Sequence, residues 1–155
     1  MSTYVLEQEQ VLPIPLEEAW SFFSTPRNLA RITPKDMGFR IEEPFDDSPM
    51  YTGQEIRYTV RPLFGIPMKW VTRIDAVEAP YRFVDTQKEG PYRLWHHEHR
   101  FESVSGGVRM IDRVRYELPL GPLGRIVHRL FVRERLVNIF SHRRKVLQEL
   151  FPAQA

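Results

Sequence analysis

Two histidines and one aspartate lie at alternating positions of a single predicted β-hairpin. Residues 92–104 place His97 and His99 on one strand face, and residues 108–118 place Asp112 on the matching face of the second strand. Charged side chains fill most of the intervening positions, so the face that carries the histidines is expected to point inward. An imidazole beside a carboxylate can transfer protons near neutral pH, hold a polar group or ligate a metal ion. The hairpin therefore predicts an inward polar patch.

The turn at residues 105–107 sets the register of this hairpin. If Phe101 lies opposite Met110, His99 faces Asp112, and opposite Cβ atoms are then about 4.5–5.5 Å apart. A slip of two residues would instead bring the other histidine beside Asp112. The same register pairs the remaining inward residues, namely His97 with Val114 and Trp95 with Tyr116.

The patch has four interpretations. His99 and Asp112, with Tyr116, could form a structural network that satisfies its own hydrogen bonds. The patch could anchor the head group of an otherwise apolar ligand, or Asp112 could raise the histidine pKa and fix its tautomer for acid–base catalysis. His97, His99 and Asp112 could also chelate a metal, but no third ligand is firmly placed. We therefore predict no metal or cofactor and assign no catalytic residue.

Neighbouring strands extend the patch if they face the same way. Asp85 and Gln87 share one strand face with Phe83, and Thr72 and Ile74 share one with Trp70. An alternative places Asp85 at a solvated sheet edge. The residues predicted to contact a ligand are Trp70, Phe83, Asp85, Trp95, His97, His99, Asp112 and Tyr116.

The elements around the hairpin follow from the changing hydrophobic period. A first strand at 3–12 precedes helices at Leu16–Ser24 and Arg27–Ile32, and a period of two then runs from Met37 to Leu118. The breakers between these strands are too short for parallel crossovers, so an antiparallel sheet is expected. Its remaining predicted strands are 38–43, 54–61, 68–77, 81–88, 92–104 and 108–118.

The C-terminal segment returns to helical spacing and stops at Pro152. Over about 28 residues it forms a helix of roughly 40 Å, long enough to cross the sheet. We expect its apolar stripe to lie on the sheet and to leave a ligand space between the two. The predicted stripe consists of Leu123, Ile126, Val127, Leu130, Phe131, Val137, Phe140, Leu147, Leu150 and Phe151.

Composition fits one domain over residues 1–155. Hydrophobic residues make up 42% of the chain, with 10 Phe, 6 Tyr and 3 Trp, which supply a core and aromatic pocket walls. The absence of cysteine excludes disulfides, thiolate chemistry and sulfur-ligated zinc. No signal peptide and no long apolar run is found, so a cytoplasmic location without a membrane span is expected.

Arginines recur along the C-terminal helix at Arg125, Arg129 and Arg133, with further basic residues after them, including Arg143. A solvated helix face is the simplest interpretation. A surface for anionic lipid or another protein is the alternative, so peripheral membrane contact stays open, as does the oligomeric state. Nucleic-acid binding is disfavoured because the arginines are not interleaved with exposed aromatics.

Taken together, the chain from Leu6 to Leu150 resembles the START-type helix-grip superfamily, known as SRPBCC. It is similar in particular to a bacterial subgroup described as ligand-binding or cyclase/dehydrase-like. The resemblance implies an α+β fold in which a curved seven-stranded antiparallel sheet wraps a long C-terminal helix, with two short helices after the first strand. It assigns no catalytic role to any residue. The residues that carry it are Trp20, Phe22 and Phe23, then Trp70-x-Thr-x-Ile74, Phe83-x-Asp-x-Gln87, Trp95-x-His-x-His-x-Phe101, Asp112-x-Val-x-Tyr116 and Pro119-x-Gly121.

The superfamily includes lipid-transfer proteins, coenzyme-Q-binding proteins, aromatic polyketide cyclases and hydrolase-like members, so the resemblance is compatible with more than one function. The leading expectation is the binding of an apolar small molecule, such as a lipid, a quinone or a polyketide-like aromatic, between sheet and helix. The alternative is a cofactor-independent cyclase or dehydratase that uses the His/Asp patch. The third is an interaction module that docks through the arginine-rich helix.

Overall fold

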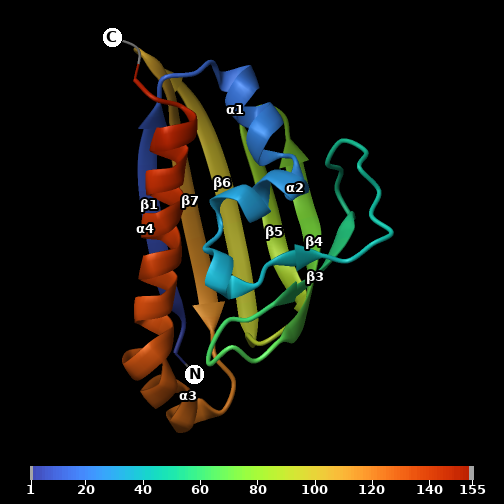
Figure 1. Ribbon diagram of the computed structural model, residues 1–155, viewed down its shortest axis with the longest axis vertical. Helices are drawn as coiled ribbons and strands as arrows, with labels where there is room; N and C mark the ends of the chain where they lie inside the picture. The colour runs from blue at the N-terminus through green and yellow to red at the C-terminus, as the bar shows by residue number, and fades with distance from the viewer. Residues whose placement is uncertain (1, 154–155) are drawn as a thin grey trace.

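A seven-stranded antiparallel sheet forms the scaffold of the protein. A computed structural model describes residues 2–153 (Figure 1). The strand order is β1-β7-β6-β5-β4-β3-β2, so the first strand pairs with the last and every other pair is sequential. The strands are β1 (Tyr4–Leu12), β2 (Arg40–Ile41), β3 (Glu55–Val60), β4 (Met68–Glu78), β5 (Arg82–Glu89), β6 (Leu94–Val104) and β7 (Gly107–Glu117).

The β6–β7 hairpin has the predicted register. Phe101 pairs with Met110, His99 with Asp112, and the strands are joined by a two-residue turn. Burial alternates along β7, where every second side chain from Val108 to Tyr116 is buried. The predicted strand at 38–43 is shorter in the structure: only Arg40–Ile41 pairs with β3.

Short helices follow β1 and cover part of one sheet face (Figure 1). Glu17 and Glu18 lie in the first turn of α1 (Leu16–Phe23), where carboxylates favour the positive end of the helix dipole. Proline at its first position starts α2 (Pro26–Leu29). Two 3₁₀ turns, η1 (Ala30–Ile32) and η2 (Lys35–Met37), continue the segment across the sheet.

The C-terminal helix runs along β1 and β7 without a break (Figure 1). It consists of α3 (Gly121–Val127), a π-helical segment η3 (His128–Val132) and α4 (Arg133–Leu150). The wider π turn keeps residues at steps of four on the inner face. The buried positions are accordingly Gly124, His128, Val132, Leu136, Phe140, Arg143 and Leu147.

This arrangement corrects the predicted apolar stripe. Phe140 and Leu147 do pack inward, but five of the predicted residues are exposed because the sequence pattern assumed a uniform α-helix. The exposed five are Leu123, Ile126, Leu130, Phe131 and Val137. None of the helices in residues 2–153 is both long and apolar enough to cross a membrane.

The fold is therefore an α+β helix-grip: a seven-stranded antiparallel sheet, short helices after the first strand and one long C-terminal helix. Its core has three clusters. One lies under α1 around Leu12 and Phe101, one lies under the start of the C-terminal helix around Val114, and one lies on β3 and β4 around Ile56.

Two adjacent glycines test how the hairpin is held against β1. A Cβ on Gly107 would lie 2.0 Å from the Leu12 carbonyl oxygen, whereas a Cβ on Gly106 meets nothing within 4 Å, although its φ is +83°. We expect Gly107→Ala to lower the free energy of unfolding by more than about 2 kcal/mol through steric conflict. Gly106→Ala should cost only about 1–2 kcal/mol, from its left-handed backbone. Urea unfolding measures both, and equal losses would contradict this account.

Candidate functional site

A cavity of about 660 Å³ lies between the sheet, the α1–η2 segment and the C-terminal helix. Its walls are mainly aliphatic and aromatic. The large exposed side chains among its lining residues mark the mouth: Phe64, Ile66 and Met68 come from the loop before β4 and its first residue, and Leu120 comes from the segment after β7. Polar side chains also line it, namely Thr33, Tyr58, Thr72, Asp85, Tyr92, His97, His99, Arg135 and Arg143.

Two imidazoles and two carboxylates form a cluster on the sheet wall of this cavity. His97 Nε2 lies 2.9 Å from Asp112 Oδ1, and His99 Nε2 lies 2.6 Å from Asp85 Oδ2. His99 Nδ1 is 3.3 Å from Asp112 Oδ1 but is not aligned for a hydrogen bond. The two imidazole rings stack with centroids 3.7 Å apart.

The strand register explains why the hydrogen bonds run diagonally. His99 is directly opposite Asp112, and His97 is directly opposite Asp85. Each imidazole nevertheless bonds the carboxylate opposite the other histidine, because diagonal neighbours on a sheet face remain within reach of long side chains. The predicted register therefore already places His97 within hydrogen-bond reach of Asp112, and no two-residue slip of the strands is needed.

Arg143 completes the cluster from the C-terminal helix. Its Nη2 lies 3.2 Å from Asp112 Oδ1, and both side chains are 8% exposed. The guanidinium also lies over Phe23 and Phe140, 5.4 and 5.8 Å from the ring centroids. The prediction that this arginine belongs to a solvated face is wrong, because position 143 falls on the inner face of the helix.

The pKa values of the two histidines are shifted in opposite directions. Burial and the neighbouring charge of His99 lower the pKa of His97, and this outweighs its bond with Asp112. Burial also acts to lower the pKa of His99, but the carboxylates of Asp112 and Asp85 raise it overall. His97 is therefore held neutral near pH 7, whereas His99 gains protons more readily than an ordinary histidine.

The carboxylates stay ionised despite their burial. Burial alone would raise the pKa of Asp112, but the charge of Arg143, the bond from His97 and the nearby His99 imidazole hold it well below its usual value. Burial also acts to raise the pKa of Asp85, but the bond from His99 and the charges of His99, His97 and Arg143 together lower it. When His99 is protonated, the charges of the two carboxylates balance those of His99 and Arg143.

The cluster has donors for a metal but unfavourable charge. Ligand atoms of Asp85, His97 and His99 lie within 4.8 Å of one another. Both imidazoles already bond carboxylates, and the Arg143 guanidinium lies against Asp112. A further cation here would face that buried positive charge, so the donor set favours a hydrogen-bonding role over metal ligation.

Six of the eight predicted contact residues line the cavity: Trp70, Phe83, Asp85, Trp95, His97 and His99. Asp85 lies on an internal strand, so its placement at a solvated edge is wrong. Asp112 lies behind the lining and acts through the histidines. Tyr116 is separate, because its hydroxyl bonds His128 Nε2 at 2.8 Å, so its predicted place in the network is also wrong. Gln87 bonds the Tyr92 backbone instead of extending the patch.

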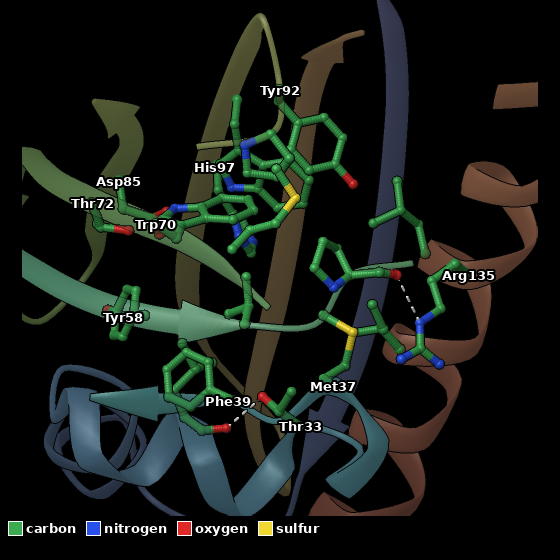
Figure 2. A pocket seen from close by; sticks show the side chains of 18 of the residues that line it. Thr33, Met37, Phe39, Tyr58, Trp70, Thr72, Asp85, Tyr92, His97 and Arg135 are labelled. Atoms are coloured by element: carbon green, nitrogen blue, oxygen red, sulfur yellow. Dashed lines mark hydrogen bonds between the residues drawn. The ribbon is translucent and has the colours of Figure 1, made fainter. Parts of the chain in front are cut away.

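Sequence reasoning missed two tyrosines of the lining. Tyr92 directs its hydroxyl into the cavity, and its ring packs against Trp70 with centroids 5.6 Å apart (Figure 2). Burial raises the pKa of Tyr58 and Tyr92, so both remain neutral hydroxyl groups. The signal for Tyr58 was its alternation with Ile56 and Val60 on one strand face, but Tyr92 precedes β6 and has no periodic signal.

Comparison with known proteins supports the fold and leaves the function open. No protein-family model and no curated protein matches the chain. Similar solved structures include TTHA0849 from Thermus thermophilus, with 17% identity over 94% of this chain and 95% of that one and a TM-score of 0.72. CV1439 from Chromobacterium violaceum has 13% identity, covers 97% and 98%, and gives a TM-score of 0.71.

A plant structure is also similar. Major latex-like protein 151 from Panax ginseng has 12% identity over 97% of this chain and 98% of that one, with a TM-score of 0.68. At such identities the likeness shows the architecture alone. It confirms the helix-grip fold that the sequence predicts.

Removing Asp112 should leave Arg143 buried without a counter-charge. We expect Asp112→Ala to lower the free energy of unfolding by about 3–5 kcal/mol. Adding Arg143→Met should restore part of this loss, with a coupling of at least about 1 kcal/mol, because the unpaired charge is removed as well. Urea unfolding of both single variants and the double variant measures the coupling.

Glu102→Ala is the matched control in the same hairpin. Glu102 forms an ion pair with Arg109 at 3.5 Å, but its side chain is 49% exposed. Its loss should cost less than about 1 kcal/mol. If Asp112→Ala and Arg143→Met changed the free energy of unfolding in a strictly additive way, the contact between the two residues would not hold the helix on the sheet.

Proposed function

We propose that the protein binds an apolar small molecule with one polar end in the cavity between the sheet and the C-terminal helix. One observation carries the proposal: the cavity wall is mainly apolar and aromatic, and His97, His99 and Asp85 form a polar cluster on its sheet side. A volume of about 660 Å³ suits a drug-sized or prenyl-sized molecule. Membership of the ligand-binding SRPBCC subgroup is part of this proposal.

Among apolar ligands, the walls favour an aromatic ring system. Trp70 and Trp95 meet edge to face with ring centroids 5.3 Å apart, and Tyr92 lies 4.9 Å from Trp95. Phe83 continues the aromatic surface by stacking on His99 at 4.0 Å. A quinone or a polyketide-like aromatic fits these rings better than a flexible acyl chain does, since rigid rings lose less conformational entropy on binding.

The polar end would be held by His97. Its Nε2 is bonded to Asp112, and within residues 2–153 its Nδ1 has no hydrogen-bond partner. A neutral imidazole that donates through Nε2 presents an acceptor at Nδ1, which suits a phenol hydroxyl. The Tyr92 hydroxyl also points into the cavity and can donate to a carbonyl oxygen of the ligand.

Binding of 1-naphthol and naphthalene tests this arrangement. We expect the protein to bind 1-naphthol more tightly than naphthalene, and His97→Phe to weaken 1-naphthol binding roughly 3- to 10-fold through the loss of one hydrogen bond. Naphthalene affinity should change less than about twofold, since a ring of similar shape remains. Quenching of Trp70 and Trp95 fluorescence provides the readout.

His96→Phe is the matched control, because His96 alternates with His97 and is not among the cavity-lining residues. It should leave both affinities unchanged. Equal affinities of the wild-type protein for naphthol and naphthalene would contradict a polar anchor.

A cofactor-independent cyclase or dehydratase is the second candidate, and one observation favours it. His97 is held neutral, oriented by Asp112 and placed in the cavity wall, which is the arrangement of a general base. Its Nδ1 would remove a proton from a carbon beside a carbonyl group, and the tyrosine hydroxyls would stabilise the resulting enolate.

Proton exchange of a 1,3-diketone in D₂O, followed by NMR, tests this candidate. The protein should accelerate exchange, and the rate should fall on acidification through the lowered pKa of His97, because only the neutral imidazole accepts a proton. His97→Gln should abolish the acceleration, and His96→Gln should not. Exchange at the buffer rate with wild-type protein would reject the catalytic role and leave ligand binding intact.

A further inference from the structure

Large apolar side chains are exposed at the end of the molecule where the cavity opens. They come from the loop between β3 and β4 and from the start of the C-terminal helix, which lie at the same end of the sheet (Figure 1). The Phe64 and Phe131 rings bring the two segments into contact, with centroids 5.2 Å apart. The exposed set, called here the docking surface, is Phe64, Ile66, Leu120, Leu123, Leu130 and Phe131.

Two of these residues are held outward by the backbone. Phe64 has φ +57° and is 71% exposed, and Leu120 has φ +75° and is 67% exposed. Within residues 2–153 they are the two non-glycine residues with positive φ. This conformation is unfavourable for large side chains, and here it places apolar groups in water at the cavity mouth.

Positive charge flanks the docking surface without compensation. Arg125, Arg129 and Arg133 are exposed, and within residues 2–153 no salt bridge to any of them is found. They line one groove with Ile126 and Val137 on the flank of the helix that faces β1. Residues 121–133 contain no acidic side chain. An exposed apolar strip beside such an arginine row is typical of helices that lie in a membrane interface.

We propose that the docking surface binds the face of an anionic lipid bilayer, with its apolar side chains in the headgroup region and the three arginines against lipid phosphates. A second copy of the chain fits this surface less well. Two-fold self-association would bring two uncompensated arginine rows together, whereas a bilayer satisfies both the apolar strip and the charge.

Docking at this surface would also determine the direction in which the cavity mouth faces. Phe64 and Leu120 belong both to the docking surface and to the cavity lining, so docking would turn the mouth toward the membrane. An apolar ligand could then pass between bilayer and cavity without crossing water. The docking itself requires no ligand, and it is tested on ligand-free vesicles independently of the function proposed above.

Co-sedimentation with phosphatidylcholine vesicles, with and without phosphatidylglycerol, tests the proposal. The wild-type protein should partition onto the anionic vesicles and only weakly onto neutral ones. Arg125→Ala/Arg129→Ala/Arg133→Ala should weaken anionic binding on the order of 100-fold. Leu123→Ser/Leu130→Ser should weaken binding at least about tenfold through the loss of inserted apolar area.

A charge-matched control separates docking from general attraction. Arg100 and Arg113 are exposed and Arg109 is half-buried on β6 and β7, and each forms an ion pair with a glutamate. Replacing these three with alanine removes the same charge and should weaken binding less than about threefold. Equal losses from both triple variants, or no binding of the wild-type protein to anionic vesicles, would overturn the proposal. A dimer in sedimentation velocity that Leu123→Ser/Leu130→Ser dissociates would also overturn it, in favour of a second copy.

Discussion

The contact between Asp112 and Arg143 is the interaction on which the rest of the site depends. A buried carboxylate and a buried guanidinium are each costly alone and tolerable together. This pair joins β7 to α4 across the sheet–helix interface, 3.2 Å apart. Because Asp112 also bonds His97 and lies 3.3 Å from His99 Nδ1, the helix position and the orientation of both imidazoles are linked. Asp112 therefore helps to arrange the cavity wall, although it does not itself line the cavity.

The result is a polar patch in the wall of a mainly apolar cavity. Asp112 bonds Nε2 of His97 and Asp85 bonds Nε2 of His99. The two rings stack 3.7 Å apart, so protonation of one histidine opposes protonation of the other. A site with one neutral and one readily protonated imidazole offers both an acceptor and a cationic donor. That is the chemistry a carrier needs to orient one end of a ligand, and it is also what an acid–base catalyst would use.

Much of this arrangement is visible in the sequence. Period-two alternation assigns His97, His99 and Asp112 to one face, and the glycine turn sets their register, because both depend on local geometry. The role of Arg143 is not visible, because helical spacing does not show that an arginine between Phe140 and Leu147 is buried against Asp112. The π-helical segment at His128–Val132 changes which residues at the start of the C-terminal helix face the sheet. The same local change exposes Leu123 and Leu130, which the pattern assigns to the core. The bond of Asp85 with His99 depends on side-chain reach across β5 and β6, which periodicity does not encode.

The NMR signals of the His97 ring nitrogens, recorded during titration with 1-naphthol, test the central claim most directly. The account predicts that Nδ1 shifts on binding, while Nε2 retains its bond with Asp112 and Arg143 remains buried. A response confined to the signals of Trp70 and Trp95, with both His97 nitrogens unchanged, would show that the ligand occupies the aromatic part of the cavity alone. It would contradict the assignment of the histidine–aspartate cluster as the anchor.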